Sequence, residues 1–309
     1  MPHITEVAPI AAALESITLG RPLSFGAVTV VPLHRMGVAE PDWLTIAEAG
    51  DAVTVTEVSD AGDVPTLTVK NNADRAVLLL DGEELLGAKQ NRILNTTVLI
   101  AAHADVGIPV SCVEQGRWSY RGRRSTSSEY SLYASLRLKK AARVTESLRE
   151  GRRHDANQGE VWDELAEKAA FLRVDSPTSA MHEVYERYAE DVKAARAAFA
   201  SVADQVGALV YVSGEWAGLE LVAAPGLFSR AWPRISTGYA ADGIGRKGNG
   251  EPRIAPDDLI KRILAAPIET APAIGLGTEY RVGGEHAVGA ALVADEVVAH
   301  LAAFPAVVD

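Results

Sequence analysis

The densest group of polar side chains in this sequence lies between two apolar runs, at residues 81–92. It reads Asp-Gly-Glu-Glu-Leu-Leu-Gly-Ala-Lys-Gln-Asn-Arg. Lysine and arginine pair with phosphate or carboxylate, and glutamine and asparagine amides both donate and accept hydrogen bonds. We therefore predict a recognition surface here, in which Glu83 or Glu84 would be the acid or base of any reaction. The ligand-binding candidates are Lys89, Gln90, Asn91 and Arg92. The alternative is a solvated edge strand that its charges protect from aggregation.

A second group follows a strand-like run, at residues 110–120, and reads Val-Ser-Cys-Val-Glu-Gln-Gly-Arg-Trp-Ser-Tyr. Such mixtures of charged and aromatic side chains occur where a planar ring and a charged group are bound together. Glu114 is the third candidate acid or base. The further ligand-binding candidates are Gln115, Arg117, Trp118 and Tyr120. In the alternative interpretation, Trp118 is a core anchor and Glu114 and Arg117 form a structural ion pair.

Several other patterns have a structural explanation. Acidic residues at 157–164 suit the first turn of a helix, where they stabilise the helix dipole. The spacing G-x-G-x-x-G at 243–248 lacks the preceding strand and following helix of a dinucleotide site, so we predict a loop. His182 and Glu186 could share a metal, but no third ligand is identifiable, and we predict no metal site. Cys112 has no assignable histidine base and is predicted to be a core residue.

The elements that position these groups begin with a β-rich half. Short runs rich in β-branched residues predict strands, and these runs are 28–33, 53–58, 66–70, 77–80, 97–100 and 106–110. A short helix is expected around 43–49. Asp81-Gly82 is the strongest hairpin signal in this half. Strands at this spacing predict an antiparallel sandwich-like or barrel-like sheet, and residues 125–128 are expected to form a polar linker after it.

Helices are predicted next, at 129–149, 159–172 and 177–206. The last begins at Ser176 and Pro177, ends at Gly207, and carries a narrow apolar stripe that predicts a partner helix in this chain or in a second copy. A hairpin around 214–218, helices opening at Pro225 and Pro256, and strands at 287–294 and 297–304 complete the chain. The predicted class is α+β. Its predicted regions are a β-sandwich-like 16–124, a helical 125–206 and an α+β 207–309.

Composition limits the function. The 309 residues are 48% hydrophobic, and the one cysteine, Cys112, excludes an intramolecular disulfide, which fits a reducing compartment. Residues 1–20 lack a secretory pattern, and no apolar run approaches the roughly 20 residues that cross a bilayer. We therefore predict a cytoplasmic protein with no membrane partner.

The charge distribution is uneven. The net charge of −11 disfavours nucleic acid as a partner. Residues 117–153 nevertheless contain eleven lysines and arginines against three glutamates. This local excess could steer an anionic ligand or an acidic partner. A solvated basic helix face is the alternative.

Four stretches resemble a prokaryotic family of uncharacterised proteins that is named for its association with ADP-ribosylglycohydrolases and rhodanese/phosphatase-superfamily proteins. The stretches are LLLDGEELLGAKQNRILNT (78–96), IPVSCVEQGRWSYRGRR (108–124), NQGEVWDELA (157–166) and TSAMHEVYE (178–186). The resemblance extends from about residue 16 to the end. It implies no activity or catalytic residues for these positions, because the name records an association. It does direct the ligand hypothesis toward ADP-ribose, NAD-derived or nucleotide species.

Two functional hypotheses follow. In the first, an anionic small molecule such as ADP-ribose or a nucleotide is bound or processed by the segments 83–92 and 114–124. In the second, a non-enzymatic scaffold self-associates into a homo-oligomer through 177–206, and its basic segment 117–153 docks an acidic partner or nucleic acid. The sequence leaves the identity of any cofactor, and enzymatic turnover itself, undetermined.

Overall fold

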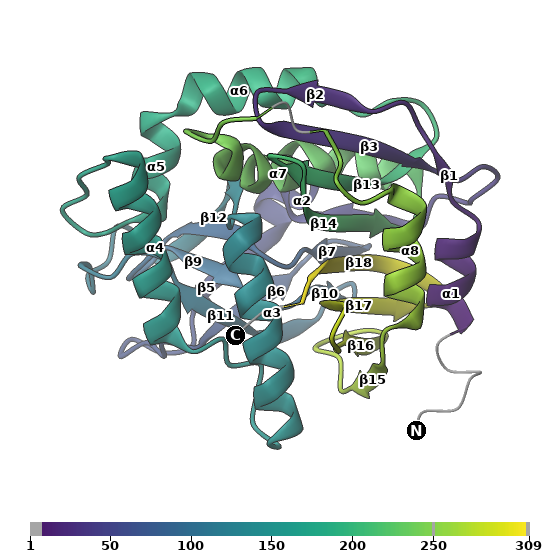
Figure 1. Ribbon diagram of the computed structural model, residues 1–309. Helices are drawn as coiled ribbons and strands as arrows, with labels where there is room; N and C mark the ends of the chain where they lie inside the picture. Colours follow the sequence, from purple (N-terminus) through teal and green to yellow (C-terminus); the bar gives the residue numbers. More distant parts are fainter. Residues whose placement is uncertain (1–7, 249–250, 307–309) are drawn as a thin grey trace.

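A computed structural model describes residues 8–248 and 251–306 of the chain (Figure 1). It confirms the α+β class, with two open sheets, one closed barrel and eight α-helices in the described part. The two ends of the chain meet in the larger sheet, whereas the middle of the N-terminal half forms the barrel.

The larger sheet has nine strands and is antiparallel throughout. Its main path is β1-β3-β13-β14-β18-β17-β16-β15, and β2 pairs with β3. The strands are β1 (Thr18–Leu19), β2 (Leu23–Phe25), β3 (Val28–His34), β13 (Gln205–Val212), β14 (Glu215–Val222), β15 (Ile268–Ala271), β16 (Thr278–Val282), β17 (Ala287–Ala294) and β18 (Val297–Pro305). The predicted C-terminal strand pair and the hairpin near 214–218 are both present.

Both faces of the centre of this sheet are covered, which explains why β13 is an almost unbroken apolar run. Ala208 and Val210 pack in one cluster with α7 (Pro225–Gly243). Leu209 lies in a second cluster with α1 (Ala8–Glu15) and α8 (Pro256–Ala265). In Figure 1, α8 and α1 lie at the edge of the molecule away from the barrel. The helices predicted to begin at Pro225 and Pro256 therefore each cover one face of the large sheet.

The N-terminal half, for which a sandwich-like or barrel-like sheet is predicted, forms a closed six-stranded barrel and not a sandwich. Its strands follow the order β11-β6-β5-β12-β8-β9. They are β5 (Val53–Glu57), β6 (Thr66–Asn71), β8 (Glu83–Gly87), β9 (Arg92–Leu94), β11 (Asp105–Cys112) and β12 (Arg124–Ser131). Closure leaves no free edge, so every strand pairs on two sides. One end of the barrel packs on a three-stranded sheet of β4 (Trp43–Thr45), β7 (Ala76–Leu79) and β10 (Val98–Ile100), together with α2 (Ile46–Ala49) and a 3-10 turn (Gly50–Ala52).

Two local predictions in this half are wrong. The polar linker predicted at 125–128 is part of β12, which closes the barrel against β5 and β8. The hairpin predicted at Asp81-Gly82 does not form, because β7 pairs with β4 and β10 whereas β8 pairs with β9 and β12. Gly82 has a φ of 81°, so the turn conformation is real, but it passes the chain from one sheet to another.

The helical part consists of α3 (Ala134–Arg149), α4 (Gln158–Leu172), α5 (Met181–Arg187) and α6 (Ala189–Ala198). The single helix predicted for 177–206 is thus two helices, and the chain changes direction between them (Figure 1). Tyr188 has left the helical region, with φ −112° and ψ 26°, and its hydroxyl donates to the carbonyl oxygen of Leu172 at 2.8 Å. The apolar stripe packs inside this chain. Trp232 of α7, for example, donates its ring N–H to the carbonyl oxygen of Phe199 at 2.7 Å.

Candidate functional site

The two polar segments singled out from the sequence lie side by side at one end of the barrel. Strand β9 follows the loop 88–91 and pairs with the end of β11, so Arg92 lies opposite Cys112. The same end carries the loop between β5 and β6 and the start of β12. The opposite end of the barrel is closed by the three-stranded sheet. This end is therefore the barrel mouth.

Strand register places Arg92 on the inner face of the barrel. Paired residues of antiparallel strands share a face, and Arg92 pairs with Leu85, which belongs to the apolar core of the barrel. The Arg92 side chain has no exposed surface. Its Nη1 donates to the side-chain oxygen of Gln90 at 3.0 Å, but its Nε and Nη2 have no hydrogen-bond partner among the described residues.

Two more inward side chains near this end have an unsatisfied polar atom. Glu57 pairs with the core residue Leu67, and Ser125 pairs with the core residue Val55. Both are buried, and neither Glu57 Oε2 nor the Ser125 hydroxyl has a partner in the described part of the chain. Neither residue is among the candidates predicted from the sequence. The signal that could have found Glu57 is its place in the alternation Val53, Val55, Glu57 along a predicted strand.

Lys89 and two aromatic rings lie over the mouth. The Lys89 ammonium is 5.2 Å from the ring centres of both Trp118 and Tyr120, and the Arg92 guanidinium carbon is 5.5 Å from that of Trp118. Lys89 donates to the carbonyl oxygen of Ala61 and has no carboxylate partner among the described residues. Trp118 is 47% and Tyr120 42% exposed, so neither is a core anchor. Cation–π contacts of this kind leave the cations available to an anion.

The Glu114–Arg117 pair proposed as an alternative is present. The two groups are 2.6 Å apart and buried. Arg117 also donates to the carbonyl oxygens of Ala88 and Ser119, and Glu114 accepts from the Asn91 backbone N–H at 3.1 Å. Burial alone would raise the pKa of Glu114, but its hydrogen bond and proximity to Arg117 hold that pKa below the ordinary value. The pair clamps the loop 88–91 to the chain after β11.

The remaining candidate residues from the sequence are paired within the fold or exposed to solvent. Glu83 contacts Arg234 of α7 at 2.5 Å, and its other oxygen accepts from the Leu80 N–H. Glu84 pairs with His182 of α5 at 3.0 Å, and its Oε1 has no partner among the described residues. The hydrogen bond from His182 to Glu84 raises the pKa of His182. The side chain of Gln115 is exposed, whereas Gln90 is buried and donates to the Glu114 carbonyl oxygen at 2.8 Å.

Cys112 is buried beside this cluster, and its thiol lies 2.8 Å from the side-chain oxygen of Gln90. Burial raises the pKa of Cys112 to about 11, against the opposing charge of Arg92. A thiol with this pKa is protonated at neutral pH. The thiol therefore donates a hydrogen bond to the side-chain oxygen of Gln90, which also accepts from Arg92.

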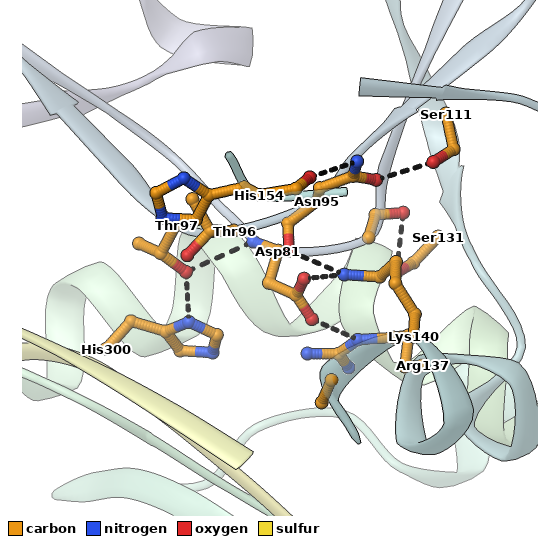
Figure 2. Close-up of polar contacts among 12 residues, drawn as sticks. Asp81, Asn95, Thr96, Thr97, Ser111, Ser131, Arg137, Lys140, His154 and His300 are labelled. Atoms are coloured by element: carbon orange, nitrogen blue, oxygen red, sulfur yellow. Dashed lines mark hydrogen bonds and ion pairs between the residues drawn. The ribbon is translucent and has the colours of Figure 1, made fainter. Parts of the chain in front are cut away.

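A second polar cluster is fully buried between the barrel, α3 and the large sheet, and Figure 2 shows it around Asp81. Asp81 pairs with Lys140 and, at 3.1 Å, with Arg137, which also pairs with Glu220 of β14 at 2.5 Å. His300 joins Glu220 to Thr97 through its two ring nitrogens, at 2.9 and 2.7 Å. We refer to these residues, with Glu279, Arg281 and His154, as the interior network.

The interior network differs from the mouth because its carboxylates, its guanidinium groups and the Lys140 ammonium all have partners. None of its members is among the described buried polar atoms that lack a hydrogen bond. Burial would raise the pKa values of Asp81 and Glu220, but the neighbouring Lys140, Arg137 and His300 charges hold both below their ordinary values. The paired charges of this network join elements of the fold rather than bind a ligand.

The basic segment 117–153 is largely neutralised by carboxylates from elsewhere in the fold. Of its eleven cationic residues, only Arg124 and Arg153 lack a carboxylate within 4 Å among the residues described. Lys140 and Arg137, for example, are buried. The local excess of charge seen in the sequence is therefore not an excess on the surface.

The glycine-rich motif near residue 243 lies at the end of a helix. The G-x-G-x-x-G spacing begins at the last residue of α7 rather than after a strand, and residues 249–250 beyond it lie outside the described part. No group of three or more metal-ligating side chains occurs in 8–248 and 251–306. In the same ranges, no helix combines the length and the apolar character needed to span a bilayer.

Fold and site together define an α+β protein with a closed barrel, and two cations at one mouth of this barrel have no carboxylate partner in the part of the chain that the structure describes. The chain belongs to the family described as the ARG and Rhodanese-Phosphatase-superfamily-associated Protein domain, whose model matches residues 16–304. The resemblance noted from the sequence is thereby confirmed. No curated protein and no solved structure matches the chain.

Proposed function

We propose that this protein binds an anionic small molecule of the ADP-ribose or nucleotide class at the barrel mouth. The observation that carries the proposal is the Arg92 guanidinium, which is fully buried and has, among the described residues, two unpartnered N–H-bearing nitrogens and no carboxylate partner. Withdrawing an ion from water costs several kcal/mol unless it is compensated. A bound phosphate or carboxylate would supply that compensation, and Arg92 would donate to it through Nε and Nη2.

In this proposal the other residues divide by their contacts. Lys89 lies beside Arg92 against the Trp118 ring and would hold the same anion or the next phosphate of a diphosphate. Trp118 and Tyr120 are exposed and would stack on a planar ring of the ligand. Gln90, Asn91, Glu114 and Arg117 would hold the loop in position through the contacts already described. Trp118 must move for the ligand to reach Arg92, which its partial exposure permits.

If the ligand is processed, Glu57 is the carboxylate best placed to act. Both oxygens of Glu83 and of Glu114 already have partners. Glu57 Oε1 accepts from the Lys89 backbone N–H at 3.2 Å, and its Oε2 is unpartnered on the inner face of the barrel. A free carboxylate oxygen beside a bound anion is positioned for general-base work.

Isothermal titration calorimetry with ADP-ribose, NAD, AMP and uncharged adenosine tests the binding proposal. We expect the three anions to bind and adenosine to bind weakly or not at all. Arg92→Met should abolish anion binding, because methionine fills a similar volume without the charge. Trp118→Ala should weaken binding by about 1–3 kcal/mol, the usual value of one stacked base.

Phe171→Ala is the matched aromatic control, since Phe171 is 57% exposed on α4 and does not contact the mouth. It should leave affinity unchanged. Anion binding that survives Arg92→Met, or a wild-type protein that binds none of the anions at millimolar concentration, would contradict the proposal.

A further inference from the structure

A groove of about 1120 Å³ lies against the barrel, and its lining shares no residue with the candidate binding residues of the mouth. It is bounded by strands β6 and β11, the C-terminal half of α3 and the start of α4. One side is apolar and carries Pro65, Pro109, Val110, Pro272 and Ile274. This volume exceeds that of a typical small-ligand site, which is about 300–1,000 Å³.

The opposite side of the groove is lined by arginines, two of which are already paired. Arg143 contacts Glu160 at 2.7 Å and Glu146 at 2.9 Å, and Arg152 pairs with Glu150. Arg153 has no carboxylate partner in the described part of the chain. The groove lining contains as many carboxylates as arginines. Arg153 is therefore the one lining arginine whose charge no carboxylate of the described residues pairs with.

The next residue, His154, also lines the groove and has one free ring nitrogen. Its side chain is 5% exposed, and its Nε2 lies 2.8 Å from Glu279 Oε2. Glu279 in turn accepts from the Thr96 hydroxyl and from Arg281, and these contacts, with His154, hold its pKa below the ordinary value against the effect of burial. An ionised Glu279 orients Nε2–H of His154 toward itself and so fixes the orientation of the ring. Nδ1 has no partner among the described residues.

The loop that carries Arg153 and His154 is held in place by hydrogen bonds to its backbone. The Ser147 hydroxyl donates to the Arg153 carbonyl oxygen at 2.7 Å, and the Asn95 amide donates to the His154 carbonyl oxygen at 2.9 Å (Figure 2). Asn95 also accepts from the Ser111 hydroxyl at 2.8 Å. A cation and an oriented imidazole are thus held at adjacent positions facing an apolar wall, which is a preorganised arrangement.

From this geometry we propose that the groove is a second binding site, for an anion attached to an apolar ring. Arg153 pairs with the phosphate or carboxylate of the ligand. His154 Nδ1 forms a hydrogen bond with a hydroxyl of the ligand, and Pro65, Pro109 and Ile274 contact the apolar ring of the ligand. The barrel mouth uses none of these residues, so the two sites are independent.

Isothermal titration calorimetry with inorganic phosphate, phenyl phosphate and benzoate tests the groove, in wild-type and in Arg92→Met protein. The Arg92→Met background removes the mouth as a competing site. We expect phenyl phosphate to bind more tightly than inorganic phosphate in both proteins, because only the former contacts the apolar wall. The comparison with benzoate shows whether phosphate or carboxylate is the preferred anion.

Two variants locate the binding. Arg153→Ala should weaken phenyl phosphate binding roughly tenfold, the value of one charge-assisted contact. Pro272→Asp, at an exposed position of the groove wall, should weaken it through repulsion of the anion. Arg21→Ala removes an exposed arginine outside the groove and should change nothing.

The proposal is overturned if neither organic anion binds at millimolar concentration. Equal affinities of wild-type and Arg153→Ala protein, or loss of phenyl phosphate binding in Arg92→Met alone, would also overturn it. The last outcome would place that ligand at the barrel mouth. Failure of the nucleotide titrations at the mouth, by contrast, leaves this test unaffected.

Discussion

Two buried arginines show how differently one residue type can be used. Arg137 lies between Asp81 and Glu220, so that its charge is compensated within the fold. Arg92 donates to the side-chain oxygen of Gln90 and lies beside Cys112 and the Trp118 ring, but no carboxylate of the described chain pairs with it. Removing one member of a compensated buried pair is strongly destabilising, whereas removing an uncompensated charge is not.

Opposite stability changes should therefore follow from the same substitution at these positions. Arg137→Met should lower the free energy of unfolding by about 3–5 kcal/mol, because Asp81 and Glu220 lose a partner. Arg92→Met should leave that free energy unchanged or raise it. Urea unfolding followed by circular dichroism measures both. Equal destabilisation by the two substitutions would show that Arg92 has a purely structural role.

Cys112 should be almost inert in the native protein. A pKa of about 11 leaves roughly one thiol in a thousand ionised at pH 8, and burial restricts access further. We expect iodoacetamide to label Cys112 rapidly only after denaturation. Mass spectrometry of native and urea-treated samples measures the difference, and fast labelling of the native protein would disprove this prediction.

At the scale of elements, the interior network joins parts of the chain that are far apart in sequence. Asp81 lies in the turn between β7 and β8, Lys140 and Arg137 lie on α3, and Glu220 and His300 lie on the large sheet. These contacts fix α3 between the barrel and the sheet. The element that carries Arg153 and His154 follows α3 directly, so the network also positions the groove.

This network should make the protein acid-sensitive. The pKa values of Asp81, Glu220 and Glu279 are below their ordinary values of 3.8, 4.5 and 4.5 in the folded state. Their contribution is therefore present above those ordinary values and is lost as the pH falls through the lower folded-state values. Urea unfolding should give a falling free energy below about pH 4. Glu279→Gln should make this fall shallower, and an unchanged slope would contradict its assignment.

The contact between β8 and α5 should have the opposite pH dependence. The pKa of His182 is raised above 6.5 by its hydrogen bond to Glu84. Its stabilising contribution is therefore complete below 6.5 and is lost as the pH rises through the higher folded-state pKa. In His182→Gln protein, the free energy of unfolding should no longer fall over this pH range. A titration of the His182 ring by NMR that gives a pKa at or below 6.5 would refute the prediction that the Glu84 contact is lost at higher pH.

At the scale of the whole molecule, the fold depends on strands from both ends of the chain. Strand β3 lies between β1 and β13, which are about 200 residues apart in sequence order, and the barrel is closed by β12. The predicted regions 16–124, 125–206 and 207–309 are therefore not separate sheets. Each one supplies strands or helices that cover an apolar face of another.

A fragment of residues 16–124 should consequently fail to fold on its own. It keeps β3 without β13 and the barrel without β12, which leaves apolar faces and strand edges unpaired. Circular dichroism and limited proteolysis of the fragment, compared with the full chain, measure this. A cooperative thermal transition in the fragment would contradict the prediction.

The sequence by itself determined the class of the fold and the places where polar side chains gather. Most strands and the helices at Pro225 and Pro256 were predictable, because alternating apolar residues and proline at the first helical position act locally. The family was also predictable, from long motifs. The segments 83–92 and 110–120 stood out because charge there interrupts apolar runs.

Only the tertiary structure decided how those side chains are used. Whether Asp81-Gly82 closes a hairpin depends on which strands compete for β7 and β8, and that competition is not local. The cations of 117–153 look unbalanced in sequence but are paired by distant carboxylates such as Glu220 and Glu269. Glu57 became a candidate site residue only because barrel closure turns it inward, and the same closure buries Arg92, which was already a candidate from the sequence. Long-range pairing sets burial, and burial decides whether a charged group is a structural partner or a binding group.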